Sequence, residues 1–262
     1  MDKKLTINSI KKLKGTRPIV MLTAYDALFA KLFEGVDILL VGDSLNMSFA
    51  GKNDTLSATL KQMIYHTNAV AAGAKNTFIV CDMPFGTYTN KDEALKNAIK
   101  VYQNSPADAI KIEGGAEVAP TIEYLCKNGI AICGHIGLLP QAFRGEGGYK
   151  IKGKDETQKQ KLIADAKAIE AAGAFCIVIE GVVAKVAKEV ANSVDIPLIG
   201  IGSGVDVDGQ VLVWSDMFGL NSGHKPKFVK EYLDGRAIFK DALKNYIDDV
   251  TNKKFPTQDE TY

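Results

Sequence analysis

Short runs of consecutive apolar residues recur along the chain, and each run ends in a polar or glycine-rich step. Because the runs are continuous rather than alternating, they predict strands buried on both faces, as in a parallel sheet covered by helices. The eighth run is the weakest. The eight predicted strands cover residues 19–26, 38–44, 77–84, 109–115, 130–137, 175–181, 196–204 and 211–219.

Segments with apolar residues at helical spacing lie between several of these runs. Gly129 and Gly173 stand at the ends of two such segments, where glycine commonly caps a helix. Strands that alternate with helices indicate an α/β fold, a (β/α)₈ TIM barrel, which we expect to form a single catalytic domain over residues 1–262. A short N-terminal helix within residues 6–18 is expected to cover the bottom of the barrel. The clearest predicted helices cover 93–103, 117–129, 159–173 and 183–194.

An open, doubly wound parallel sheet is the alternative fold. Such sheets usually carry a glycine-rich turn after the first strand. In this chain the first predicted strand runs into the sequence AYDALFAKLF, which contains no glycine. The closed barrel is therefore the preferred prediction.

Composition and charge narrow the class of protein. The chain has 262 residues, a length typical of one α/β barrel, and its 46% hydrophobic content argues against disorder. The formal net charge of +1 gives no indication of a nucleic-acid or anionic-membrane partner. We find no signal-peptide pattern and no apolar run near the roughly 18 residues of a membrane helix, so a cytoplasmic enzyme is expected.

The cysteines show no CxxC spacing that would indicate a metal or redox motif. Three of them lie inside predicted strands, where we expect buried thiols in a reducing compartment. The four cysteines are Cys81, Cys126, Cys133 and Cys176.

Carboxylates follow three consecutive predicted strands. Asp43, Asp82 and Glu113 stand at the strand ends, and neighbouring strands lie about 4.8 Å apart. Three carboxylates this close repel one another unless a cation joins them. Oxygen ligands favour Mg²⁺, with Mn²⁺ or Co²⁺ as possible substitutes. A single aspartate at a strand end is often a helix cap, but three independent caps in a row are a poorer explanation.

Further polar residues are expected at the same end of the barrel. Ser44 follows Asp43, and Lys111 lies two residues before Glu113, so both side chains of that strand face one side. Glu180 ends the sixth run beside apolar neighbours, which favours a general base, with a salt bridge or cap as the alternative. His135 either lines the substrate site or is a hydrogen-bonded core residue.

Weaker signals carry less chemistry. His66 lies in a helical stretch and is expected to be structural. Cys133 and His135 lack a second cysteine or histidine pair, so zinc is not indicated. The glycines of 200–204 resemble the phosphate-binding turns of some barrels, although they also suit close packing.

Longer blocks of sequence are more specific than single residues. They are LLVGDSLNMSFAGKNDTLSATLKQMIYHTNAVAAG, CDMPFGTY, KIEGG, GHIGLLPQ, GGYKIKG, AIEAAGA, IEGVVAKVAKEV, IPLIGIGSG, DGQVLV and GHKPKF. In this order, over nearly the whole chain, the blocks resemble the ketopantoate hydroxymethyltransferase family.

The resemblance implies a cytosolic (β/α)₈-barrel enzyme that forms a homo-oligomer, typically a homodecamer. It implies transfer of a one-carbon unit from 5,10-methylenetetrahydrofolate to 3-methyl-2-oxobutanoate, which gives 2-dehydropantoate for pantothenate and coenzyme A biosynthesis. It places Mg²⁺ on Asp43, Asp82 and Glu113, and the general base on Glu180. The substrate-binding residues that the resemblance suggests are Asp43, Ser44, Asp82 and Lys111. His135, at the end of the fifth predicted strand, is expected to bind the substrate beside them.

Two positions depart from the pattern expected of the family. Asn46 stands where glycine is expected, and Val183 stands where proline is frequent. Neither is a proposed ligand, so the expected activity is unaffected.

Two other functions compete with this one. A Mg²⁺-dependent carbon–carbon lyase or mutase of the phosphoenolpyruvate mutase/isocitrate lyase type would share the barrel and the carboxylates, but its usual KKCGH-type loop is missing from the sequence. A non-catalytic metabolite-binding barrel would be expected to lose a metal ligand or the base. Asp43, Asp82, Glu113 and Glu180 are all present.

Overall fold

The computed structural model describes residues 4–221, 223 and 225–262. The chain divides into two compact units, Met1–Val213 and Trp214–Tyr262, and the first unit holds all of the barrel strands. The single domain expected over residues 1–262 stays a prediction. Within the described residues, no helix has the length and apolar character needed to cross a membrane.

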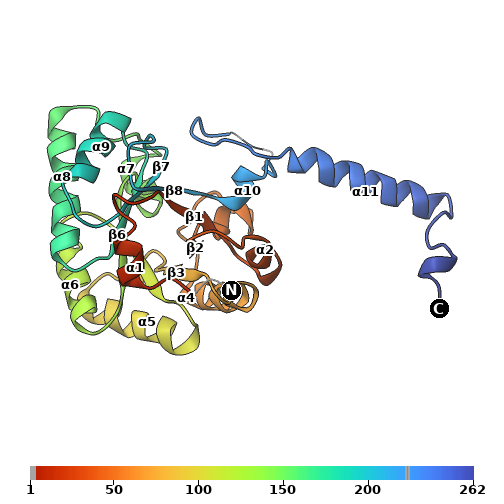
Figure 1. Ribbon diagram of the computed structural model, residues 1–262, viewed down its shortest axis with the longest axis horizontal. Coiled ribbons are helices and arrows are strands. Elements are labelled where there is room, and N and C mark those ends of the chain that lie inside the picture. The colour runs from red at the N-terminus through yellow and green to blue at the C-terminus, as the bar shows by residue number, and fades with distance from the viewer. Residues whose placement is uncertain (1–3, 222, 224) are drawn as a thin grey trace. The chain divides into compact units, whose positions relative to one another are not determined.

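The described strands form a closed parallel barrel, as predicted (Figure 1). Each strand pairs with the next in sequence, and β8 pairs with β1 to close the sheet. The (β/α)₈ fold class is thereby confirmed and the open sheet is excluded. The strands are β1 (Ile19–Thr23), β2 (Ile38–Val41), β3 (Phe78–Asp82), β4 (Ala109–Glu113), β5 (Ile132–Gly137), β6 (Cys176–Glu180), β7 (Leu198–Ile201) and β8 (Gly209–Leu212).

Helices separate the strands of the first unit except β7 and β8, which follow each other without a helix between them. The four clearest sequence predictions of helices are confirmed within a few residues at each end. These helical segments are α1 (Ile7–Lys11), α2 (Ala27–Leu32), α3 (Leu45–Ser48), α4 (Leu60–Gly73), α5 (Lys91–Asn104), α6 (Ala119–Lys127), η1 (Pro140–Ala142), α7 (Phe143–Glu146), α8 (Glu156–Ala171) and α9 (Ala184–Asn192). The second unit contains α10 (Trp214–Met217), α11 (Gly235–Thr251) and η2 (Gln258–Glu260).

The eighth predicted strand, 211–219, is partly wrong. Strand β8 begins earlier, at Gly209, and the second half of the apolar run forms the short helix α10. A short apolar run does not distinguish a buried strand from a buried helix, because both conceal every side chain. Gly209 itself is required by close packing, since a Cβ there would lie 2.5 Å from the carbonyl oxygen of Ile19.

The short helix α1 closes the N-terminal end of the barrel. Its residue Ile10 is fully buried and belongs to the same hydrophobic cluster as Ile19, Ile38 and Phe78, which begin β1, β2 and β3. The predicted cover of the barrel bottom is therefore present. With that end sealed, the C-terminal ends of the strands are free to build a site.

Three aspartates, each one residue before a strand, join neighbouring strands at the N-terminal end. Asp37 precedes β2, and its Oδ2 accepts the N–H of Val20 in β1 at 2.9 Å. Asp108 and Asp208 stand in the same position before β4 and β8 and accept an N–H from β3 and β7 at 2.8 and 2.9 Å. These carboxylates extend the strand pairing beyond the sheet proper.

Basic residues of the N-terminal segment pair with the same three aspartates. Each pair is partly shielded from water, which makes it stronger than a fully exposed ion pair. The segment is thereby fastened to three separate strands. The pairs are Lys4–Asp108, Lys14–Asp208 and Arg17–Asp37, with nitrogen–oxygen distances of 2.6, 2.8 and 2.6 Å.

We predict that Asp37→Asn lowers the free energy of unfolding by about 1–2 kcal/mol at neutral pH, because a charged acceptor is lost from Arg17 and Val20. The Arg17 guanidinium and the Val20 N–H lower the pKa of Asp37 in spite of its partial burial. A lowered folded-state pKa contributes stability above the unfolded value near 3.9, and this contribution is lost as the pH falls through the folded value.

Denaturant unfolding at neutral pH and near pH 3 measures this difference. The gap between wild type and Asp37→Asn should narrow at the lower pH. Glu123→Gln is the control, because its pair with Lys127 is exposed and should contribute little. A gap that is equal at both pH values would contradict the assignment.

Candidate active site

Three buried carboxylates gather at the C-terminal ends of β2, β3 and β4, where the sequence predicted them. Asp43, Asp82 and Glu113 are each at most 5% exposed. One oxygen of every carboxylate accepts a hydrogen bond from the chain: Asp82 from the Asp43 N–H at 2.9 Å, Asp43 from the Gln141 amide at 2.8 Å, and Glu113 from the Gln141 N–H at 3.0 Å. The cluster is thus held by backbone and amide donors.

The carboxylates disturb one another electrostatically. Burial together with the charges of Asp82 and Glu113 raises the pKa of Asp43 well above its usual range. Burial also raises the pKa of Asp82, against the opposing effect of Lys111. Glu113 differs, because His135 and Lys111 outweigh burial and lower its pKa. Negative charge is therefore most unfavourable at Asp43.

Lys111 supplies the nearest positive charge. Its Nζ lies 3.2 Å from Asp82 Oδ1 and 3.7 Å from Glu113 Oε1, and the surrounding carboxylates raise its pKa although burial opposes them. The contact with Asp82 lacks hydrogen-bond geometry, so Asp82 Oδ1 is a buried oxygen without a hydrogen-bond partner. Such an oxygen is unfavourable unless a further cation or donor completes it.

His135 connects the carboxylate cluster to Glu180. Its Nδ1 lies 3.0 Å from Lys111 Nζ and 3.4 Å from Glu113 Oε1, and its Nε2 lies 3.3 Å from Glu180 Oε2, at an angle too poor for a hydrogen bond. Burial and Lys111 lower the pKa of His135, but Glu113 and Glu180 prevail and raise it to about 9. The Lys111 ammonium can only donate, so Nδ1 of His135 must accept in their contact. Protonation of His135 at Nδ1 would therefore break this contact.

The donor set suits a hard divalent cation. Carboxylate oxygens are the ligands that Mg²⁺ favours, and Asp82 Oδ1 has no hydrogen-bond partner. In the part of the chain that the structure describes, no three ligating side chains already stand at metal-holding positions. The Lys111 ammonium is the cation beside Asp82 and Glu113 in this arrangement, so a metal would require these side chains to shift.

Glu180 lies at the other edge of this group, at the end of β6. Its side chain is 18% exposed, which leaves it accessible to a small molecule. The register pairs Glu180 with Gly137 of β5 and Ile201 of β7. His135 lies between Glu180 and Glu113 of the carboxylate cluster, so Glu180 is placed apart from the proposed metal ligands.

Ser44 directly follows Asp43 and immediately precedes helix α3. Its hydroxyl lies 2.8 Å from that of Tyr25, a fully buried residue whose pKa burial raises. Gly42 provides room for this serine, since a Cβ at that position would lie 2.8 Å from Ser44 Oγ. The sequence predicted Ser44 in the site but missed its aromatic partner.

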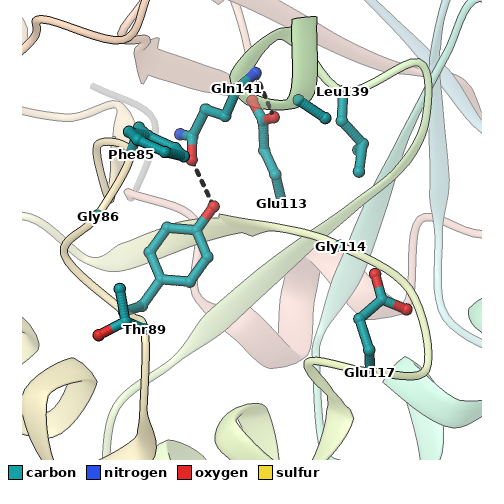
Figure 2. Close-up of a pocket in the computed structure, with 10 residues that line it drawn as sticks. Phe85, Gly86, Thr89, Glu113, Gly114, Glu117, Leu139 and Gln141 are labelled. Atoms are coloured by element: carbon teal, nitrogen blue, oxygen red, sulfur yellow. Dashed lines mark hydrogen bonds between the residues drawn. The ribbon is translucent and has the colours of Figure 1, made fainter. Parts of the chain in front are cut away.

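Gln141 was also missed, although it ends the GHIGLLPQ block. Its side-chain amide donates to Asp43 and to the carbonyl oxygen of Met83, while its Oε1 accepts from the Tyr88 hydroxyl (Figure 2). Through its backbone N–H it also holds Glu113. One residue thus orients two carboxylates, a role that neither residue type nor spacing indicates, because Gln141 lies in a helical turn beyond β5.

The weaker sequence signals are structural. His66 Nδ1 lies 2.6 Å from the carbonyl oxygen of Tyr25, as expected of a structural histidine. In the glycine-rich turn after β7, a Cβ on Gly204 would lie 2.5 Å from Ala184 Cβ. The glycine there is explained by packing against α9. Cys133 belongs to the hydrophobic core cluster.

The two unusual positions have local explanations. The Asn46 side chain donates to the Asp54 carbonyl oxygen at 2.8 Å and to Ser57 at 2.9 Å, which fastens the loop after α3. The Val183 N–H donates to the Lys152 carbonyl oxygen at 3.0 Å. Proline has no N–H, so this chain makes a bond that the expected residue would lack.

These residues and the closed parallel barrel define a (β/α)₈-barrel enzyme, with its chemistry at the C-terminal ends of the strands. Comparison with known sequences names the family. Residues 4–258 match the family described as ketopantoate hydroxymethyltransferase, and the chain belongs to it. It is accordingly an enzyme that transfers a hydroxymethyl group.

Similar proteins cover the full chain. The 3-methyl-2-oxobutanoate hydroxymethyltransferase of Sulfurimonas denitrificans is 69% identical over 100% of both chains. That of Aliarcobacter butzleri is 59% identical over 99% of this chain and 97% of its own.

Solved structures at low identity share the fold alone. A phosphonopyruvate hydrolase has a TM-score of 0.63 at 13% identity, covering 98% of this chain and 93% of its own. A 2,3-dimethylmalate lyase has a TM-score of 0.60 at 15% identity, covering 98% and 92%.

We predict that Gln141→Met lowers hydroxymethyl transfer about 10–100-fold, because Asp43 loses its amide donor and its orientation. The backbone N–H to Glu113 is retained, so some activity should remain. Steady-state kinetics measures the change. Gln160→Met is the control, since Gln160 is exposed on α8 and bonds only to Glu156 among the described residues. Equal activity of both variants would exclude an orienting role.

Proposed function

We propose that the enzyme carries out Mg²⁺-dependent transfer of the one-carbon unit of 5,10-methylenetetrahydrofolate to 3-methyl-2-oxobutanoate, forming 2-dehydropantoate in pantothenate and coenzyme A biosynthesis. The observation that carries the proposal is the buried carboxylate cluster, joined through His135 to a separate, accessible carboxylate. The cluster of Asp43, Asp82 and Glu113 suits a cation, and the separate carboxylate of Glu180 suits the role of a general base. The names of the full-length relatives supply the 2-oxo acid.

Asp43, Asp82 and Glu113 would hold Mg²⁺, with Mn²⁺ or Co²⁺ as alternatives. When bound, the cation would supply Lewis-acid polarisation of the keto group of the substrate. Asp43 benefits most, because its charge is the least favourable of the three in the absence of a cation.

The remaining residues bind and orient the 2-oxo acid. Lys111 is buried and positively charged, so it offsets the substrate carboxylate. Ser44 donates or accepts at the same end of β2, where the Tyr25 hydroxyl fixes its position. His135 completes the wall between Lys111 and Glu180.

Glu180 accepts the C3 proton of the substrate. Its carboxylate stands apart from the three proposed ligands and keeps one face accessible, which leaves it free to act as a base. His135 Nε2 lies 3.3 Å from this carboxylate and separates it from the buried cluster. Loss of the proton makes C3 nucleophilic toward the one-carbon unit of the folate.

The assembly is proposed to be a homo-oligomer, a homodecamer by family resemblance, in the cytoplasm. Helix α11 carries large apolar side chains that its own unit leaves 45–59% exposed, and a second copy would cover such side chains in an oligomer. Light scattering at micromolar protein should show a large closed oligomer, and a fully active monomer would contradict this. The residues are Ile238, Phe239, Leu243, Tyr246, Ile247 and Val250.

The direct test of the proposed function is formation of 2-dehydropantoate from 3-methyl-2-oxobutanoate. Product should require both the folate and a divalent cation, and chelation should abolish it. Asp82→Ala should lose turnover while the barrel stays folded, since Asp82 ends β3 at the site. Normal activity of Asp82→Ala with Mg²⁺ would exclude the metal assignment.

Glu180→Gln isolates the proton-transfer step. We predict kcat lower by about 10²–10⁴-fold, because the amide keeps the shape and loses the basicity. Exchange of the C3 hydrogen of the 2-oxo acid into D₂O, without folate, should slow by a similar factor. Glu189→Gln, an exposed change on α9, is the control. Equal exchange in wild type and Glu180→Gln would identify another base, with His135 the next residue to test.

A further inference from the structure

Two cavities adjoin each other beside the carboxylate cluster. The first, of about 270 Å³, has largely apolar walls that include Phe85, and Glu113 opens it toward the cluster (Figure 2). The second, of about 400 Å³, extends toward α8. Glu117 and Leu139 line both cavities, so the two cavities lie next to each other, and we refer to the pair as the groove.

The ends of this groove differ in chemistry. Phe85 contributes an aromatic ring that is 54% exposed, so its face is free to contact a ligand. Figure 2 shows this ring beside Gln141, across the cavity from Glu117. A flat, largely apolar group fits against such a ring.

The second cavity is lined by lysines. Lys152 is neutralised by Glu146 at 2.5 Å, and Lys161 by Asp165 at 2.8 Å. Lys150 and Lys154 have no ion-pair partner among the described residues. With Glu117 as the third carboxylate of the lining, four lysines face three carboxylates, so the cavity carries a net positive charge and suits an anion. Its lysines are Lys150, Lys152, Lys154 and Lys161.

The lysine-bearing segment is fixed in place by the residues that directly follow β6, the strand that ends at the proposed base. The Lys152 N–H donates to the Gly181 carbonyl oxygen at 2.9 Å, and the Lys152 carbonyl oxygen accepts from Val183. Gly153 adopts a positive φ of 76°, and a Cβ there would lie 3.1 Å from Val186. The backbone of this segment is thus positioned relative to Glu180 by hydrogen bonds and close packing.

We infer that this groove binds the reduced folate, with its pterin ring against Phe85 and its glutamate carboxylates against Lys150 and Lys154. The inference rests on the proposed function, which requires a folate. A reduced folate is elongated, with a flat ring at one end, a carboxylate tail at the other and the one-carbon unit between them. The ring would lie in the cavity with Phe85, and the carboxylate tail in the cavity with the lysines. The one-carbon unit would lie between them, near Glu113.

Calorimetric binding of tetrahydrofolate tests the lysine cavity. The probes are the monoglutamate and the triglutamate, each at about 50 and about 500 mM NaCl. Lys150→Gln/Lys154→Gln should raise the Kd of the triglutamate roughly tenfold at low salt and less at high salt, because exposed charge contacts are modest and screened. In turnover, KM for the folate should rise far more than kcat falls.

Two further variants separate the contributions. Lys167→Gln/Lys185→Gln removes the same charge from exposed lysines on α8 and α9 that lie outside the cavity, and should leave the Kd unchanged. Phe85→Ala should raise the Kd of both probes equally and independently of salt.

An unchanged Kd in Lys150→Gln/Lys154→Gln, or an equal rise in the Lys167→Gln/Lys185→Gln control, would overturn the inference. Wild-type exchange of the C3 hydrogen distinguishes the two proposals. If the wild type exchanges and binds tetrahydrofolate but the lysine variants bind it normally, only the groove assignment fails. If the wild type neither exchanges nor binds tetrahydrofolate, the proposed function fails with it.

Discussion

The burial of several negative charges close together is the constraint on which the C-terminal end of this barrel depends. Asp43, Asp82 and Glu113 are buried on adjacent strands, where repulsion and desolvation both oppose ionisation. Their neighbours are arranged to offset that cost: Lys111 by its charge, and Gln141 by two hydrogen bonds to the cluster. At Asp43 and Asp82 the charged carboxylate remains unfavourable, as their raised pKa values show. A bound divalent cation would remove this remaining cost.

The two ends of the barrel divide stability and chemistry between them. At the N-terminal end, Asp37, Asp108 and Asp208 each have a basic partner and a backbone donor, so charge there stabilises the closed sheet. At the C-terminal end, charge is gathered at a cost to stability. A fold in which one end is securely fastened tolerates such a concentration at the other.

The sequence predicts the barrel well because eight apolar runs recur along the chain with helical patterns between several of them, a combination typical of this fold. It predicts the strand-end residues because parallel strands present those ends together. It fails where position depends on tertiary contacts. Gln141 and Tyr25 act through partners distant in sequence, and β8 shares an apolar run with α10. The lysine cavity depends on how the Lys152 segment pairs with residues after β6, which no local pattern encodes.

Thermal unfolding of wild type and Asp43→Asn, with chelator and with Mg²⁺, tests the central claim most directly. The raised folded-state pKa of Asp43 means that its charge destabilises the metal-free protein above the unfolded value near 3.9. Asp43→Asn removes that charge and keeps an oxygen for Gln141. In chelator the variant should therefore unfold at or above the wild-type midpoint, whereas Mg²⁺ should raise the midpoint of the wild type much more than that of the variant. A lower midpoint of the variant in chelator, with an equal response of both proteins to Mg²⁺, would contradict a cation site built on repelling carboxylates.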